Sequence, residues 1–210
     1  MSRLVGIYGA SGCGRGIMPL ARAMPSLAAD RLVFIDDNPA AAVVNGHPVL
    51  TFEQFVAEPE ANKVAALAIA NAPIRRRLAQ RCDAAGIALL TIAAERLVIM
   101  DDVVIGEGAL LSPFVTFTSN IRVGRCFHAN LYSYVEHDCV IGDFVTFAPG
   151  VRCNGNVTIG DDAYIGSGAI IRQGLTIGAG ATIGMGAVVT KDVPPGVTMV
   201  GNPARPLIKD

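Results

Sequence analysis

Residues 159–188 read IGDDAY-IGSGAI-IRQGLT-IGAGAT-IGMGAV when the chain is cut every six residues. Each block begins with isoleucine and has a small or apolar residue at its fifth position, and glycine follows the isoleucine in most blocks. The same frame extends back to Ile99, and its first position is apolar in all sixteen blocks from Ile99 to Val189. A period of six is neither the period of an ordinary strand nor that of a helix.

Such a period is typical of a triangular coil, in which each block supplies one short strand and one corner. The first-position side chain points inward, the small fifth-position residue fits near the corner, and three blocks complete a turn. One coil cannot bury its own inner face, so stacked coils build the core and pair as parallel strands ~4.8 Å apart. We therefore predict an all-β parallel β-helix over residues 96–194, too narrow inside for large aromatics, followed by a tail at 195–210.

The first 95 residues have a different pattern, in which short aliphatic runs alternate with helical segments. Leu4–Tyr8 and Arg31–Ile35 are typical of buried strands, and the glycine-rich residues 9–14 open a helix that runs to about Ala23. Strands that alternate with helices indicate parallel βαβ units, so we predict an α/β, Rossmann-like module over residues 1–95. Glycine usage supports the division, because seven of the 23 glycines precede residue 99 and fourteen lie between 99 and 194.

Composition excludes several classes of protein. Of the 210 residues, 51% are hydrophobic and 17% are charged, with a net charge of −1. The sequence contains no run of about 18 apolar residues, which a transmembrane helix requires. It also lacks a basic stripe that could neutralise the phosphates of a nucleic acid. The five cysteines lack metal-type spacing and the N-terminus lacks the shape of a signal peptide, so we expect free thiols and a cytoplasmic location.

Five motifs give the chain a family resemblance. They are GASGCG (9–14), FIDDN (34–38), AIANAPIRRRLA (68–79), YVEHDCVIGD (134–143) and GNPARP (201–206). With the two-module layout, they resemble the bacterial sialic-acid O-acetyltransferase-like sugar acyltransferases, which include N-acetyltransferases of nucleotide-linked amino sugars. The resemblance implies a left-handed β-helix, acetyl-CoA as co-substrate, and a homotrimer with active sites between neighbouring β-helices.

His137 is the best candidate for a catalytic base. A free imidazole titrates near ~6.5 and can accept a proton at neutral pH. His137 and Asp138 fall at the third and fourth positions of their block, where side chains leave the core at a corner. A carboxylate beside an imidazole raises its basicity and can fix its tautomer. The resemblance likewise implies that His137 is the base and Asp138 its modulator.

The same resemblance implies which residues bind acetyl-CoA. These are Thr146, Gly155, Ser167 and Met185, with Arg205 near a phosphate of the adenosine end. The backbone N–H of Gly155 is the candidate donor to the oxyanion, although a simple turn glycine explains this residue equally well. The family often has histidine where this chain has Thr146, which blurs this part of the expected site.

The nucleotide sugar is expected in the N-terminal module. Glycines at a strand-to-helix turn let the backbone approach a pyrophosphate at a helix N-terminus, and acidic residues that end the next strand can accept hydrogen bonds from ribose or base. The expected residues are Gly9, Ser11, Gly12, Cys13, Gly14, Asp36 and Asp37, with Asn71, Arg75 and Asn130 implied by the resemblance. The family often has histidine at the position of Cys13, so the identity of the sugar stays open.

The remaining histidines receive no catalytic role. His47 lies between Gly46 and Pro48, in a predicted turn, and His128 has no acidic neighbour and is expected at a surface or an interface. Two histidines within the repeats are too few for a trimeric three-histidine site, so we expect no metal. The expected activity is acetyl-CoA-dependent N-acetylation of a nucleotide-linked 4-amino-4,6-dideoxyhexose, such as GDP-perosamine, for surface polysaccharide or glycan synthesis. The alternatives are sialic-acid-type O-acetylation and a non-catalytic solenoid that binds a nucleotide sugar.

Overall fold

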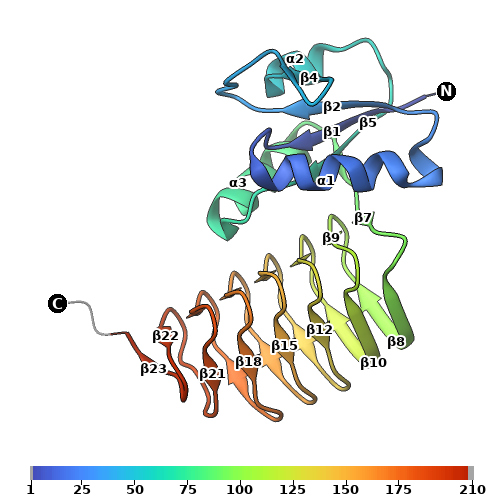
Figure 1. The fold of residues 1–210 in the computed structure, drawn as a ribbon. Helices are drawn as coiled ribbons and strands as arrows, with labels where there is room; N and C mark the ends of the chain where they lie inside the picture. The colour runs from blue at the N-terminus through green and yellow to red at the C-terminus, as the bar shows by residue number, and fades with distance from the viewer. Residues whose placement is uncertain (1, 208–210) are drawn as a thin grey trace. The chain divides into compact units, whose positions relative to one another are not determined.

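The computed structural model describes residues 2–207 and divides the chain into two compact units, residues 1–95 and 96–210 (Figure 1). The elements of the first unit are β1 (Leu4–Tyr8), α1 (Gly12–Ala23), the 3-10 turn η1 (Pro25–Leu27), β2 (Arg31–Ile35), β3 (Val43–Val44), β4 (His47–Leu50), α2 (Phe52–Ala57), β5 (Lys63–Leu67), α3 (Ala72–Ala84), β6 (Ala88–Leu89) and β7 (Ile92–Ala93).

The first unit is a sheet with helices on both faces. Its strand order is β3-β4-β2-β1-β5-β6, and its neighbouring strands run parallel apart from the β3–β4 hairpin. Right-handed crossovers place α1, which links β1 to β2, on one face and α2 with α3 on the other. Arg81 of α3 lies 4.2 Å above the ring of Phe52 in α2, as expected for helices that share a face. The sheet sets the carboxyl ends of β1 and β2 side by side.

The second unit is a stack of coils (Figure 1). Its strands are β8 (Val98–Ile105), β9 (Leu110–Leu111), β10 (Thr116–Val123), β11 (His128–Ala129), β12 (Tyr134–Val135), β13 (Val140–Ile141), β14 (Thr146–Phe147), β15 (Arg152–Cys153), β16 (Thr158–Ile159), β17 (Tyr164–Ile165), β18 (Ile170–Ile171), β19 (Thr176–Ile177), β20 (Thr182–Ile183), β21 (Val188–Val189), β22 (Thr198–Val200) and β23 (Arg205–Pro206). Val135 pairs with Cys153, and Cys153 with Ile171, so residues eighteen apart stack on successive coils.

The predicted inner positions are buried with two exceptions. All the first-position side chains from Leu111 to Val189 are buried, but Ile99 is 47% exposed and Ile105 is half-buried, because no earlier coil of the β-helix covers the first coil. The expectation that large aromatics would not fit inside is wrong. Phe117, Phe127 and Phe147 are fully buried and meet edge-to-face, with ring centroids 6.2 and 5.1 Å apart. Small residues elsewhere in the coils leave room for them.

Corner geometry recurs at the fourth position of each block. Every fourth position from Asp102 to Gly186 has a positive φ, which glycine, asparagine and aspartate tolerate best. Glycine at the second position has another purpose, since a Cβ on Gly142 would lie 2.7 Å from the backbone nitrogen of Asp161 on the next coil. Glycine is therefore required for close stacking at the second position, whereas the turn also accepts other residues, even Phe114 and Tyr132.

The frame of six ends at Val189. Thr182 pairs with Thr198 and Ile177 with Val193, so the last coil is two residues shorter than the others. β23 then folds back antiparallel on β22. The end of the β-helix thus brings residues near 191 and 205 together.

Candidate active site

His137 and Asp138 project outward from one corner of the β-helix. Asp138 has the corner conformation, with φ 59°. The side chains of His137 and Asp138 are 57% and 52% exposed, and Nδ1 of the imidazole lies 2.8 Å from Oδ2 of the carboxylate. The other carboxylate oxygen accepts a hydrogen bond of 3.1 Å from Nδ2 of Asn120, one coil earlier. His137 and Asp138 are therefore joined by a hydrogen bond as well as being neighbours in the sequence.

This geometry fixes the tautomer of His137. A carboxylate only accepts hydrogen bonds, so Nδ1 carries the hydrogen and Nε2 is left as the basic nitrogen. The hydrogen bond to Asp138 raises the pKa of His137 above its ordinary value. The hydrogen bonds from His137 and Asn120 hold the pKa of Asp138 below its usual range. The pair is therefore a base with a permanently charged partner at neutral pH.

Gly155 lies directly against the imidazole. It is eighteen residues after His137, so it occupies the same corner on the next coil. A Cβ at this position would lie 2.7 Å from Nε2 and 2.6 Å from Cε1 of His137, so only glycine leaves room for the ring. The carbonyl of Gly155 accepts from the Gly174 amide, whereas its own N–H donates to no other residue among 2–207. The corner therefore combines a base and an unused amide donor.

The other residues expected to bind acetyl-CoA lie elsewhere on the β-helix. Ser167 and Met185 are eighteen residues apart and share a different corner, where Met185 is 83% exposed. Thr146 is buried in β14 on a third part of the coil. A single chain therefore does not bring these three residues to His137.

Arg205 lies in a pocket at the end of the β-helix. The pocket has a volume of about 290 Å³ and is lined by Lys191, Asp192, Pro194, Met199, Ala204, Arg205 and Pro206. Lys191 and Arg205 are both exposed, so two cations face one hollow. Lys191 was not among the predicted residues, because the shortened last coil that brings it there does not show in the hexad frame.

In the N-terminal unit, the predicted glycine loop follows β1 and opens α1. Gly9 has φ +104°, and a Cβ on Gly14 would lie 1.7 Å from the Gly9 carbonyl oxygen. The amides of Ser11, Gly12 and Cys13 make no hydrogen bond to another part of the described chain. α1 has no acidic residue in its first turn, so these amides and the helix dipole are available to an anion.

Of the two acidic residues after β2, Asp36 bonds the glycine loop, whereas Asp37 ties the end of β1 to α2 and α3. Asp36 accepts hydrogen bonds of 3.1 Å from the amides of Ala10 and Asn38. Asp37 accepts from the Tyr8 hydroxyl at 2.7 Å, from the Phe52 amide at 3.0 Å and from Arg81 at 2.5 Å. Burial would raise the pKa of Asp37, but these hydrogen bonds hold it below its ordinary value. The Asp37 carboxylate is therefore already engaged by the protein.

Three further residues expected near the sugar have structural partners. The Asn71 side chain caps α3 by accepting from the Ile74 amide at 3.0 Å. Arg75 is fully buried, and its Nη1 donates to the carbonyls of Ile69 and Ala70 at 2.6 and 3.1 Å. The guanidinium is closed to solvent in this conformation, so the role of Arg75 as a ligand contact stays a prediction. Asn130 is exposed, with its Oδ1 accepting from the Leu131 amide.

His128 corrects a second expectation. The sequence predicts a surface or interface position, but His128 is only 6% exposed, in β11. It pairs in register with Thr146, where the family often has histidine. Within residues 2–207, no group of three or more His, Cys, Asp or Glu side chains is placed to hold a metal ion. Across the same range, no helix is both long and apolar enough to cross a membrane.

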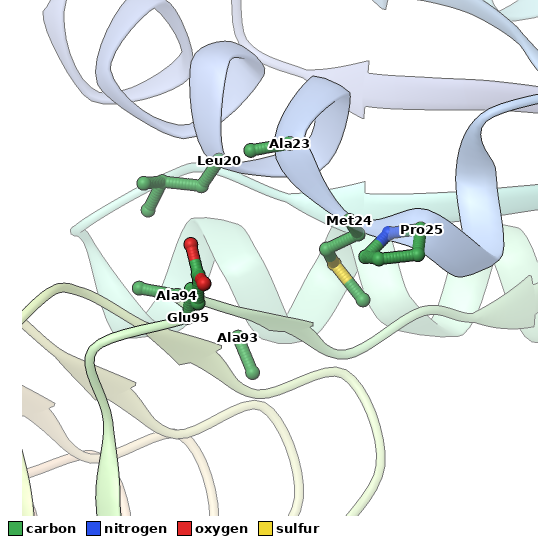
Figure 2. A pocket seen from close by; sticks show the side chains of 7 residues that line it. All are labelled: Leu20, Ala23, Met24, Pro25, Ala93, Ala94 and Glu95. Atoms are coloured by element: carbon green, nitrogen blue, oxygen red, sulfur yellow. The ribbon is translucent and has the colours of Figure 1, made fainter.

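A pocket that the sequence did not indicate lies in the N-terminal unit (Figure 2). Its volume is about 270 Å³, and it is lined by Leu20, Ala23, Met24, Pro25, Ala93, Ala94 and Glu95. The lining side chains are apolar apart from the Glu95 carboxylate. None of the predicted ligand residues lines this pocket, so it is separate from the glycine loop.

Comparison with known proteins defines the class first. Residues 156–191 match the family model described as bacterial transferase hexapeptide (six repeats), and residues 5–82 match the PglD N-terminal domain. Together with the coils, these matches confirm the predicted fold class, a Rossmann-like α/β module followed by a left-handed parallel β-helix.

Individual relatives narrow the class. The chain is 50% identical to the GDP-perosamine N-acetyltransferase of Escherichia coli O157:H7, over 96% of this chain and 95% of that one. The structure of WeeI from Acinetobacter baumannii AYE is 51% identical with a TM-score of 0.95, over 98% of this chain and 100% of that one. The acetyltransferase domain of PglB from Neisseria gonorrhoeae FA1090, solved with acetyl coenzyme A, is 32% identical with a TM-score of 0.90, over 99% and 100%. The chain therefore belongs to the hexapeptide-repeat sugar N-acetyltransferases, as the motifs indicated.

Proposed function

We propose that this protein transfers the acetyl group of acetyl-CoA to the amino group of a nucleotide-linked 4-amino-4,6-dideoxyhexose, with GDP-perosamine as the acceptor. The observation that carries the proposal is the corner where Nε2 of His137 lies against Gly155 while Nδ1 bonds Asp138. The name of the 50% identical relative supports the choice of acceptor. Surface polysaccharide or glycan synthesis would consume the product.

The corner supplies the groups that acyl transfer to an amine requires. The amine nitrogen attacks the thioester carbonyl carbon, so a C–N bond forms and negative charge develops on the carbonyl oxygen. The Gly155 N–H donates to that oxyanion, and Nε2 of His137 takes the proton lost by the nitrogen. When the C–S bond breaks, the CoA thiolate takes the proton from the imidazolium. Asp138 stabilises the imidazolium between these steps.

The nucleotide sugar is assigned to the N-terminal unit mainly through backbone groups. The amides of Ser11, Gly12, Cys13 and Gly14 at the start of α1 are suited to a pyrophosphate. Gly9 and Gly14 allow the close approach, and Asp36 fixes the loop through the Ala10 amide. Asp37 would instead fix the end of β1 through the Tyr8 hydroxyl, and Asn130 stays a predicted sugar contact.

The acetyl-CoA residues suggest a homotrimer. His137 and Gly155 share one corner of the β-helix, whereas Ser167 and Met185 share another. We assign the CoA chain that touches both corners to a groove between two copies, where the exposed Met185 would be covered by the ligand or by the second copy. Lys191 and Arg205 would hold phosphates at the adenosine end. All five cysteines are free, which suits the reducing cytoplasm where acetyl-CoA is available.

An acetylation assay tests this function. The protein is incubated with acetyl-CoA and GDP-perosamine, CoA thiol release is followed, and the product is treated with hydroxylamine, which cleaves esters and spares amides. We expect release that depends on the amino sugar and a hydroxylamine-resistant product. A matched nucleotide sugar with a hydroxyl at the 4-position should be inert. Preference for the hydroxyl acceptor, or no thiol release with either, would overturn the proposal.

A further inference from the structure

The corner that holds Gly155 differs from equivalent corners in its backbone hydrogen bonding. At the second position of the blocks, the amide donates to a carbonyl of the next coil at 2.7–3.0 Å in the other bonds of this series. The Asn154 amide, which directly precedes Gly155, lies 3.3 Å from the Ile171 carbonyl oxygen. The longest hydrogen bond of this series is therefore the one next to the candidate oxyanion donor.

A side chain supplements this long bond. Nδ2 of Asn154 donates to the same Ile171 carbonyl at 2.8 Å. Its Oδ1 accepts a hydrogen bond of 3.0 Å from the hydroxyl of Tyr134. A continuous chain of hydrogen bonds thus runs from Tyr134 through Asn154 to Ile171 and ties three successive coils together.

The placement of this chain relates it to the reaction. Tyr134 is on the coil that carries His137, three residues before the base, and Asn154 is on the coil that carries Gly155. The Asn154 side chain therefore sets how the Asn154–Gly155 peptide, whose N–H faces the reaction, sits against the coil of the base. Gly155 has no side chain of its own to fix that peptide, and a small misplacement of a catalytic group costs a large part of the rate.

We propose that Tyr134 and Asn154 are positioning residues that hold the Gly155 N–H in line with the base. This inference rests on the proposed function of Gly155 as the oxyanion donor. Neither residue needs to touch the substrate, because the effect passes through the orientation of one peptide group. The two residues act as a unit, since Asn154 is oriented by the Tyr134 hydroxyl.

Removal of that hydroxyl is the test, with a matched control on the same β-helix. Tyr134→Phe should lower kcat about tenfold, which is part of the 10²–10³-fold effect of losing an oxyanion donor. The KM for acetyl-CoA, the acidic limb of the pH profile and Tm should stay close to those of the unaltered protein. Tyr164→Phe removes the same group from an exposed position on β17 and should leave kcat unchanged.

A second variant keeps the inference testable if Tyr134→Phe is less stable. Asn154→Ala should lower kcat at least as much, and the double variant should be no slower than Asn154→Ala alone, because the residues act as one unit. The inference would be overturned by additive losses of kcat in the double variant or by a shift of the acidic limb of the pH profile in Tyr134→Phe. Equal kcat values in Tyr134→Phe and Tyr164→Phe would also overturn it. These outcomes are separable from failure of the proposed function, which would show as no amine-dependent thiol release by the unaltered protein.

Discussion

The two units present different kinds of groups to a ligand. In the β-helix, the candidate side chains of His137 and Asp138 leave a corner and are exposed. In the N-terminal unit, the candidate side chains of Asn71, Arg75 and Asp37 are used inside the protein, while the backbone amides of the glycine loop remain open. We infer a division of labour in which side chains of the β-helix perform the chemistry and the backbone of the N-terminal unit binds the nucleotide.

His137→Asn removes the proposed catalytic base of the β-helix and should have the largest effect on kcat. Asparagine keeps a polar group near Asp138 but cannot accept the proton, so kcat should fall about 10³-fold. The Kd of the nucleotide sugar should not change. Thiol-release kinetics and calorimetry measure the two quantities, and His47→Asn in the N-terminal unit serves as the control. Turnover close to that of the unaltered protein would remove His137 from the mechanism.

Gly155→Ala also tests the chemical role of the β-helix, because it moves the base without removing it. The new Cβ would lie within 2.7 Å of Nε2, so the ring must shift from its position over the amide. We expect kcat to fall about 10²-fold, because a displaced imidazole loses much of the 10²–10⁴-fold effect of a positioned base. Tm should change little, because the imidazole is exposed and can turn toward solvent. An unchanged kcat would show that the position of the His137 ring does not matter.

Gly14→Ala tests the backbone side of the comparison. A Cβ at this position would meet the Gly9 carbonyl oxygen at 1.7 Å, so the loop between β1 and α1 must open. The KM for the nucleotide sugar should rise about tenfold or more, at little cost to kcat at saturation. Gly16→Ala in the same helix meets open space and is the matched control. A loss confined to kcat would contradict a binding role for this loop.

Lys191→Ala and Arg205→Ala probe the third ligand region, with a smaller effect. Both side chains are exposed, so each substitution should raise the KM for acetyl-CoA only about two- to fivefold. The effect should vanish with an acetyl-CoA analogue that lacks the 3′-phosphate, if these cations bind that group. An equal rise in KM with both thioesters would show that the two cations do not bind the 3′-phosphate.

The pH profile tests the His137–Asp138 contact and should show the smallest change. Because Asp138 raises the pKa of His137, the base is neutral only above that raised value, and kcat/KM should decline as pH falls through it. Asp138→Asn removes the stabilising charge, so the acidic limb should move to lower pH. A limb that stays in place would indicate that a group other than His137 titrates.

The sequence predicted the β-helix better than it predicted the use of the side chains. A strict period fixes the inner positions, so Val135 and Ile171 are buried as expected. The same period makes neighbours of residues eighteen apart on successive coils. That spacing can be counted in the sequence, and it relates Asn120 to Asp138 and His137 to Gly155. The hydrogen bonds between side chains, in contrast, depend on rotamers that the period does not specify.

The N-terminal unit has no such period, and its side-chain contacts depend on tertiary packing. Nothing in APIRRR marks Arg75 as the buried arginine, because its burial depends on how α3 packs on the sheet. The same holds for the shortened last coil, which brings Lys191 and Arg205 together through a contraction that follows Val189. Local sequence does not specify such long-range contacts.

One crossed measurement tests the division of labour most directly. The kcat and the Kd for GDP-perosamine are measured for His137→Asn and Gly14→Ala under the same conditions. The division of labour predicts that His137→Asn loses turnover and keeps its Kd, while Gly14→Ala binds weakly and keeps its turnover at saturation. Loss of both quantities in both folded variants, or the reverse assignment, would contradict it.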